Sequence, residues 1–271
     1  MDRITSRKNP QIVLLRSLAS DASLRAERGE FVCDGLKLLD EAVAAGAEIC
    51  SVLWKEGGAV RMSAHETLCD RQFLAPQELF DYASPMKNSP GPLFSARVRG
   101  AVRGPARENG ATLAAQDFAP DEKVENALIL ENVQDPGNVG TVLRTANAFS
   151  IGAVILIGDC ADLYSPKTVR STMGAIFRQK VLHLELGELP DWLRRNGLKL
   201  FGAALCEDAE ELQKVDITRS AVAVGSEGRG LSAELLALCE KKIIIPMSPA
   251  SESLNAAVAA SVLMWEMRRG R

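Results

Sequence analysis

The chain has 271 residues, of which 46% are hydrophobic, 25% are charged and 5% are aromatic. This is ordinary globular composition, and it excludes a collagen, a disulfide scaffold and a disordered tail protein. The net charge of −3 means that a nucleic-acid partner would have to bind a local basic face. Residues 1–110 contain 15 basic and 14 acidic side chains, whereas residues 111–271 contain 17 basic and 21 acidic side chains. This difference favours the first part of the chain as the binding site for a polyanion.

Hydropathy predicts neither export nor membrane insertion. The opening MDRITSRKNP lacks the apolar core of a secretory signal, and the apolar run at 256–265 is about half a bilayer span. The cysteines are never closer than 17 residues, so there is no CxxC motif, and the two histidines are isolated. We therefore expect a cytoplasmic protein with reduced thiols, no membrane association and no metal.

The first hundred residues are typical of a small α/β unit. The pattern predicts helices at 10–20 and 36–45 and strands at 29–33 and 49–54. Residues 84–110 are rich in proline and glycine, which predicts a turn, an edge strand and then a mobile joint. The basic residues of this stretch could contact RNA or could belong to a solvated linker; they are Lys87, Arg97, Arg99, Arg103 and Arg107.

From residue 126 short β-branched runs alternate with helical periods. This alternation predicts a mostly parallel sheet covered on both faces. Ligands in such sheets bind at the carboxyl ends of strands, so the loops there are candidate sites. The predicted strands are 127–131, 153–157, 199–204, 221–224 and 243–245, and the predicted helices are 138–150, 166–177, 189–196, 232–240 and 253–267.

The first strand-end loop lies within residues 131–149. Its Asp-Pro-Gly turn precedes Asn138, which we expect to cap the following helix. Arg144 would then lie near the positive end of that helix dipole, an unfavourable place for a cation unless an anion binds. The alternative is an ordinary surface arginine.

The second loop lies within residues 221–232. An apolar strand leads into Gly225, and further glycines flank Glu227, so a ligand could approach the backbone closely. Ser232 is predicted to cap the next helix. The pattern is not the GxGxxG dinucleotide motif, and a plain strand-turn-helix connection is the alternative.

The third loop lies within residues 241–269. Pro246 stops a buried strand, and a helix rich in small residues begins near Ser253. Ser253 and Asn255 offer donors suited to a carboxylate or to the edge of an adenosine. A capped amphipathic helix without a ligand is the alternative.

Together the three loops resemble the SpoU family of RNA ribose methyltransferases, within the SPOUT superfamily. Its three motifs are similar, in order, to NVGTVLRTANAF, VGSEGRGLS and IPMSPASESLNAAVAASVLMWE, across about residues 126–269. The stretches FVCDGLKLLDEAVAAGAEICSVLWKEG and SPGPLFSARVRG are similar to the ribosomal-protein-like domain that often precedes this catalytic domain.

The resemblance implies an α/β fold with a mostly parallel sheet and a C-terminal deep trefoil knot, an exception to the rule against threading. It also implies a smaller α/β RNA-binding domain in front, which resembles a ribosomal protein. Residues 1–110 would be the RNA substrate-binding domain with its linker, and residues 111–271 the methyltransferase domain.

The resemblance further implies S-adenosyl-L-methionine as the cofactor, in a pocket formed by the knot, and a homodimer in which Arg144 reaches a site completed by the other subunit. The implied cofactor contacts are Gly225, Ile245 and Leu254, with Leu205, Pro246 and Asn255 nearby. The implied catalytic positions are Asn138, Arg144, Glu227, Ser253 and Asn255. The SPASES stretch departs from the glycines frequent in the family, which bears on loop geometry.

The expected activity is S-adenosylmethionine-dependent 2′-O-methylation of RNA ribose, with 23S ribosomal RNA as substrate and transfer RNA as the alternative. A non-catalytic RNA-binding or ribosome-assembly protein on the same fold is the alternative from another class. A nicotinamide-dependent oxidoreductase fits poorly because the glycines are misplaced. Our mechanistic hypothesis is that Arg144 stabilises developing alkoxide charge and binds the adjacent phosphate, while Glu227 orients Asn138, Arg144 or backbone donors.

Overall fold

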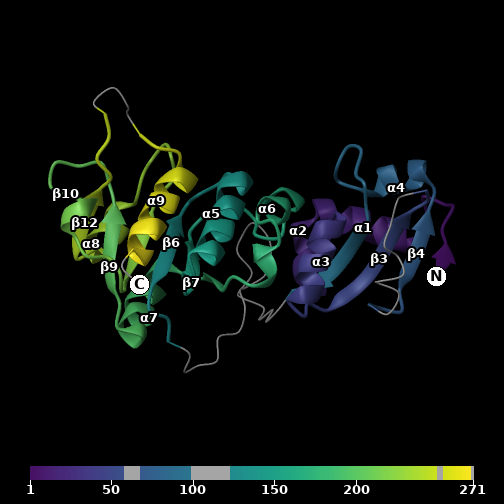
Figure 1. The fold of residues 1–271 in the computed structure, drawn as a ribbon, viewed down its shortest axis with the longest axis horizontal. Helices are drawn as coiled ribbons and strands as arrows, with labels where there is room; N and C mark the ends of the chain where they lie inside the picture. The colour runs from purple at the N-terminus through teal and green to yellow at the C-terminus, as the bar shows by residue number, and fades with distance from the viewer. Residues whose placement is uncertain (58–67, 99–122, 249–252, 270–271) are drawn as a thin grey trace. The chain divides into compact units, whose positions relative to one another are not determined.

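A computed structural model describes residues 1–57, 68–98, 123–248 and 253–269 (Figure 1). The chain divides into two compact units. The first comprises Met1–Asp117 with Asp162–Arg178, and the second comprises Phe118–Ala161 with Gln179–Arg271. The domain boundary predicted at residue 110 would put residues 162–178 in the second domain. The contacts of these residues put them in the first unit.

The first unit is built on a five-stranded sheet with the order β1-β4-β3-β5-β2. Strand β5 (Leu93–Arg97) lies between two antiparallel neighbours, so the prediction of an edge strand there was wrong. The physical reason is its burial, since Leu93, Phe94 and Ala96 are fully inaccessible to solvent. The other strands are β1 (Asp2–Arg3), β2 (Glu30–Asp34), β3 (Ile49–Lys55) and β4 (Gln72–Ala75).

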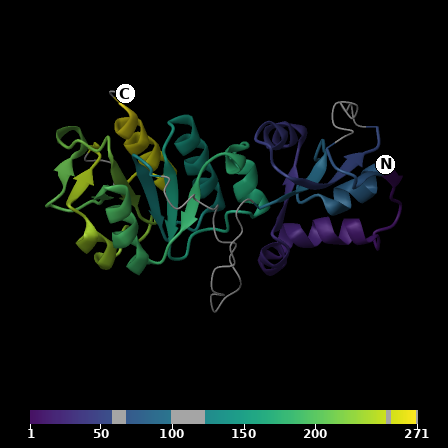
Figure 2. The same cartoon turned by 90° about the horizontal axis from the view of Figure 1, so that it is seen from below.

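Helices cover both faces of this sheet. The predicted first helix, α1 (Pro10–Ser20), is confirmed, and it begins where the side chain of Asn9 accepts a hydrogen bond from the amide of Gln11 at 2.8 Å. Figure 2 shows α1 on one face of the sheet and α3 on the other. The remaining helices are α2 (Ala22–Arg28), α3 (Leu36–Ala44) and α4 (Gln77–Ala83).

The second unit has a seven-stranded sheet with the order β10-β12-β9-β11-β6-β7-β8, and each recorded strand pairing is parallel. The predicted mostly parallel sheet is therefore confirmed. Strands β6, β7 and β11 are buried at every position, as a sheet covered on both faces requires. The bounds are β6 (Ala127–Glu131), β7 (Ala153–Ile157), β8 (Val181–His183), β9 (Lys199–Ala203), β10 (Glu210–Glu211), β11 (Ser220–Val224) and β12 (Lys241–Ile244).

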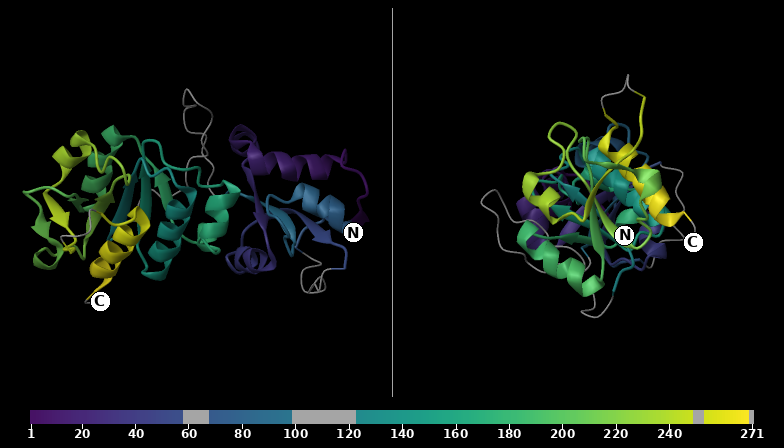
Figure 3. Two further views of the ribbon diagram at one scale, coloured as in Figure 1. Left: turned by 90° about the horizontal axis from the view of Figure 1, so that it is seen from above. Right: turned by 90° about the vertical axis from the view of Figure 1, so that its left-hand side faces the viewer.

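Helices α5 and α9 lie side by side on one face of this sheet, and α7 and α8 cover the other face (Figures 2 and 3). The bounds are α5 (Pro136–Ala148), α7 (Leu189–Asn196), α8 (Ala233–Leu238) and α9 (Ala256–Arg268), with short 3₁₀ helices η3 (Leu186–Glu188) and η4 (Leu212–Lys214). In the described part of the chain, no helix is long and apolar enough to cross a membrane.

Two helix starts differ from the sequence prediction. Helix α5 is capped by Asp135, whose Oδ1 accepts from the amide of Asn138 at 3.0 Å, so Asn138 lies in the first turn. Asp135 takes the cap because Pro136 directly after it favours the first helical position. Helix α9 begins at Ala256, with Asn255 as its cap instead of Ser253. The predicted cap at Ser232 is confirmed by its bond from the amide of Leu235 at 3.1 Å.

The segment 162–178 belongs to the core of the first unit. The predicted helix at 166–177 is split into α6 (Pro166–Ser171) and the 3₁₀ helix η2 (Ala175–Phe177), because Gly174 between them has a left-handed φ of 94°. The ring of Phe31 lies 4.8 Å from that of Tyr164 and 6.0 Å from that of Phe177.

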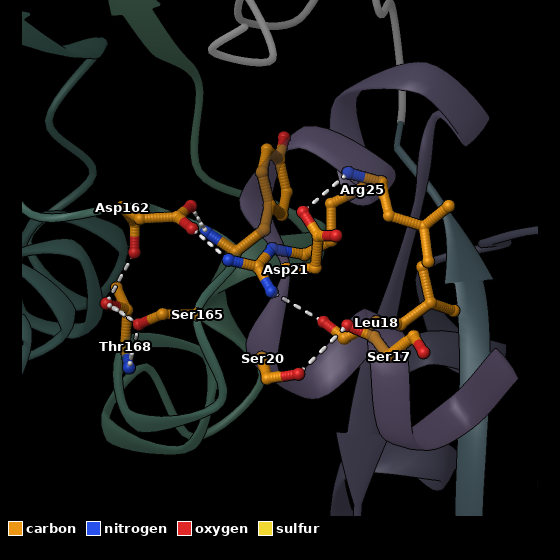
Figure 4. Close-up of polar contacts among 10 residues, drawn as sticks. Ser17, Leu18, Ser20, Asp21, Arg25, Asp162, Ser165 and Thr168 are labelled. Carbon is orange, nitrogen blue, oxygen red and sulfur yellow. Dashed lines mark hydrogen bonds and ion pairs between the residues drawn. The ribbon is translucent and has the colours of Figure 1, made fainter. Parts of the chain in front are cut away.

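An ion pair with a buried arginine joins this segment to α2. The side chain of Arg25 is only 5% exposed; it donates to the carbonyl of Leu18 at 2.5 Å and forms an ion pair with Asp162 (Figure 4). The backbone carbonyl of Asp162 accepts from the hydroxyl of Thr168 at 2.7 Å, which ties the start of α6 to the same point.

We expect Asp162→Ala to lower the free energy of unfolding by about 2 kcal/mol, because Arg25 would stay buried without its anion. Asp162 is itself 37% exposed, which places the cost below that of a fully buried pair. Urea-induced unfolding measures the change. Glu240→Ala removes the exposed ion pair with Lys199 and serves as the control, with an expected loss below about 1 kcal/mol. Equal losses in the two variants would contradict the assignment.

Candidate functional site

A cavity of about 420 Å³ lies at the carboxyl ends of β9, β11 and β12. Three segments that are far apart in sequence line it. They are the loops after β9 and β11 and the connection from β12 to α9. Its volume is within the range of small-molecule sites. Among the predicted cofactor and catalytic residues, those that line it are Leu205, Gly225, Glu227, Ile245, Ser253 and Leu254.

A second, larger cavity of about 590 Å³ adjoins the first. Its walls come from the loops after β6, β7 and β11, and they include Asn132, Gln134, Asn138 and Asp159. The two cavities share five lining residues of one loop, which are Ser226, Glu227, Arg229, Gly230 and Leu231. Molecules bound in the two cavities would therefore lie next to each other, on either side of this loop.

Glu227 is the centre of a polar network at this junction. Its Oε1 accepts hydrogen bonds from the side-chain amide of Asn138 at 2.8 Å and from that of Asn255 at 2.6 Å. The two asparagines also contact each other directly, with Nδ2 of Asn255 donating to Oδ1 of Asn138 at 3.1 Å. Three predicted site residues from three separate loops are thus brought together.

Asn255 has two roles in this arrangement. Its Oδ1 accepts from the amides of Ala257 at 3.0 Å and Val258 at 3.3 Å, which caps α9, while its Nδ2 faces Glu227. The amide of Ala256 also points to Glu227, at 3.3 Å. The cap at Asn255 is therefore confirmed, and the same side chain ties the start of α9 to the shared loop.

The shared loop is tightly folded. A Cβ atom at Gly225 would lie 2.1 Å from the backbone of Gly230, so only glycine fits there. Gly230 has a φ of 66°, and its amide donates to the carbonyl of Ser226 at 2.8 Å. These glycines serve the turn itself, as the alternative of a strand-turn-helix connection expects.

Glu131 anchors the far end of this loop, and the sequence analysis missed it. Its buried carboxylate accepts from the hydroxyl of Ser232 at 2.6 Å and from the amide of Ser232 at 2.7 Å. The available signal was a lone acidic residue that ends the apolar strand ALILE. A buried carboxylate requires such partners, so the residue marks a contact between β6 and α8.

Three predicted site residues line neither cavity: Arg144, Pro246 and Asn255. Arg144 is exposed on α5 and has no carboxylate partner among the described residues. It is the ninth residue of a helix that starts at Pro136, so the argument that placed it at the positive end of the dipole was wrong. Pro246 is exposed just after β12.

A lysine and a cysteine at the rim of the smaller cavity are held in their ordinary protonated forms. Nζ of Lys242 donates to Asp208 at 2.7 Å, and this hydrogen bond raises the pKa of Lys242. Desolvation, with Asp208 nearby, raises the pKa of the Cys206 thiol. Neither side chain is therefore poised as a base or thiolate nucleophile. Among the described residues no group of three or more histidine, cysteine or acidic side chains could hold a metal ion.

A parallel sheet whose strand ends carry two adjoining cavities is the architecture of an enzyme that brings two substrates together. The model of the SpoU rRNA methylase family matches residues 125–265, more than half of the 271-residue chain. The chain belongs to this family, a family of RNA methyltransferases.

Three relatives extend the comparison over the whole chain. An uncharacterized tRNA/rRNA methyltransferase of Synechocystis sp. is 34% identical and covers 98% of this chain and 93% of its own. A 23S rRNA (uridine(2479)-2′-O)-methyltransferase of Streptomyces viridochromogenes is 28% identical over 99% of this chain and 92% of its own. The crystal structure of an rRNA methyltransferase from Sinorhizobium meliloti is 26% identical, covers 99% of this chain and 97% of its own, and superposes with a TM-score of 0.82.

Proposed function

We propose that the protein transfers a methyl group from S-adenosyl-L-methionine to a ribose 2′-hydroxyl of RNA. The observation that carries the proposal is the junction of the two cavities at the network of Asn138, Glu227 and Asn255. Family membership over residues 125–265 supports the same reaction.

The smaller cavity suits the cofactor. Its apolar walls, with Ile245 and Leu254, can hold an adenosine, and backbone groups around Leu205 and Gly225 supply polar contacts. When bound, S-adenosylmethionine supplies an electrophilic methyl group on a sulfonium.

The larger cavity would receive the target nucleotide. Asn138 and Asn255, held by Glu227, would orient the ribose, and Ser253 offers a further hydroxyl from the wall of the smaller cavity. Arg144 would bind the adjacent phosphate and stabilise negative charge on the 2′-oxygen as the hydroxyl proton passes to solvent water. A guanidinium keeps its proton at neutral pH, so we assign Arg144 the role of a cation and not of a base.

A second copy of the chain would complete the site. Val258, Val262 and Trp265 form an exposed apolar stripe on α9, with exposed fractions of 49%, 37% and 56%. The stripe lies on the helix beside α5, which carries Arg144. We propose a homodimer that buries this stripe and brings Arg144 of one subunit to the site of the other.

We also propose that the segment between β12 and α9 threads as a deep trefoil knot. In the sheet, β9 lies between β12 and β11. Helix α9, however, packs beside α5 and against β11. The chain after β12 must therefore cross back over the sheet to reach its helix. Residues 249–252 of this connection lie outside the described residues.

Ribosomal RNA, and specifically 23S RNA, is the proposed substrate, with transfer RNA as the alternative. A relative that matches 99% of the chain, including the first unit, is named as a 23S rRNA methyltransferase. The proposed location is the cytoplasm, where the six cysteines, all free thiols, would stay reduced.

The deciding experiment incubates the protein and labelled S-adenosylmethionine, in parallel, with protein-free 23S RNA and with transfer RNA from a strain that lacks this protein. Label in 2′-O-methylated nucleotides, at a position unmodified in the deletion strain, is the expected result. Incorporation into transfer RNA alone would overturn the ribosomal assignment. No transfer to either RNA, despite cofactor binding, would favour the non-catalytic alternative.

A further inference from the structure

Two arginines contact one tyrosine ring at the surface of the first unit. The guanidinium carbon of Arg7 lies 4.7 Å from the ring centroid of Tyr82, and that of Arg16 lies 4.2 Å from it. Nη1 of Arg16 also donates to the backbone carbonyl of Tyr82 at 2.6 Å. We call these three residues the Tyr82 cluster. It joins α1 and the residues before it to α4.

No carboxylate among the described residues neutralises the positive charge of the Tyr82 cluster. Residues 1–20 contain four basic side chains and one acidic side chain. Arg3 forms an ion pair with Glu56, but within the described ranges neither Arg7 nor Arg16 has a carboxylate partner. Both arginines are exposed.

The basic stretch singled out in the sequence is a weaker candidate for RNA contact. Arg97 forms an ion pair with Glu48 and donates to the carbonyl of Arg28 at 3.0 Å, so its charge is already compensated. Arg99, Arg103 and Arg107 lie outside the described residues.

We propose that the Tyr82 cluster binds RNA. A planar guanidinium presents donors that match phosphate oxygens, and the ring beneath it limits the side-chain freedom lost on binding. Aromatic and guanidinium planes also stack on unpaired bases, the feature that single-stranded RNA offers and an acidic protein surface lacks. The inference rests on the proposed function and assigns part of its substrate contact to the first unit.

The test measures binding of the full-length protein to protein-free 23S RNA between about 50 and 200 mM KCl. In the double variant Arg7→Gln, Arg16→Gln, the slope of log affinity against log salt should weaken by about 1.4 to 1.8, since each phosphate contact contributes about 0.7 to 0.9. Tyr82→Leu should lower affinity about fivefold or more with little change in slope.

Arg3→Gln is the matched control, because it removes a cation from the same segment whose charge Glu56 already neutralises. Its slope should equal that of the wild type. Arg7→Lys, Arg16→Lys keeps both charges and should keep the slope, which separates charge from folding. Thermal unfolding of each variant is measured in parallel.

A double glutamine variant that folds and retains the wild-type slope would overturn the proposal, as would an equal loss in Arg3→Gln. Methyl transfer by the wild type is assayed separately with the same RNA. If the wild type transfers no methyl group but the slope falls as expected, the proposed function fails while the binding surface stands. If transfer occurs but the slope is unchanged, the binding surface alone fails.

Discussion

Replacement of Arg144 by alanine is expected to slow methyl transfer at least a hundredfold, about the effect of removing one donor that stabilises transition-state charge. The residue is exposed on α5, has no carboxylate partner among the described residues and lines neither cavity. Cofactor affinity should therefore stay at the wild-type value. Single-turnover transfer of labelled methyl groups and calorimetric titration with the cofactor measure the two quantities.

Arg219→Ala provides the control for Arg144. Arg219 is an exposed arginine next to the amino end of β11, at the opposite end of the strand from the site. The Arg219→Ala variant should transfer methyl groups at the wild-type rate. An Arg144→Ala variant that keeps more than half of the wild-type rate would remove the residue from the mechanism.

Mixed dimers test where Arg144 acts. If the site is completed across subunits, Arg144→Ala mixed with a second inactive variant, Asn138→Ala, should regain activity, because one of the two sites in a heterodimer would be intact. Absence of any recovery in verified heterodimers would place Arg144 in its own subunit's site.

Glu227→Gln is expected to slow transfer by about tenfold to a hundredfold. The carboxylate oxygen that accepts from Asn138, Asn255 and Ala256 becomes a neutral amide oxygen, and hydrogen bonds to charged groups are the stronger ones. The change should appear mainly in kcat if the network orients the ribose for reaction. Steady-state kinetics with the 23S RNA substrate separates kcat from KM.

A double-mutant cycle distinguishes positioning from a general loss of stability. Asn138→Ala should cost less in the Glu227→Gln background than in the wild type, because the hydrogen bond that Asn138→Ala removes is already weakened there. Glu234→Gln, a carboxylate in the first turn of α8, is the control and should add to Asn138→Ala without coupling. Strict additivity of Glu227→Gln and Asn138→Ala would contradict the network.

Local pattern was enough to predict the second unit's architecture. Apolar β-branched runs marked β6 and β7 with their observed bounds, and their burial on both faces is what makes such runs continuous. The residue that caps α5 was harder to predict than the strands. Asp135 and Asn138 both suit a cap, and Pro136 decided between them.

The candidate site could be named by its motifs, but not by its contacts. The resemblance of three loops to the family's motifs pointed to Asn138, Glu227 and Asn255, while the choice of Asn138 and Asn255 over Arg144 as partners of Glu227 required the fold. Short local patterns carry no information about which strand ends become neighbours, because strand order depends on packing across the whole sheet.

The sequence alone determined the α/β class of the second unit, its strand-end loops and the family to which the chain belongs, since these depend on local periodicity and residue type. Only the tertiary structure decided that β5 is an interior strand, that 162–178 packs with the first unit through Arg25 and Asp162, and that two arginines share the ring of Tyr82. Each of these joins residues distant in sequence, and the burial and charge that favour them arise only once the chain has folded.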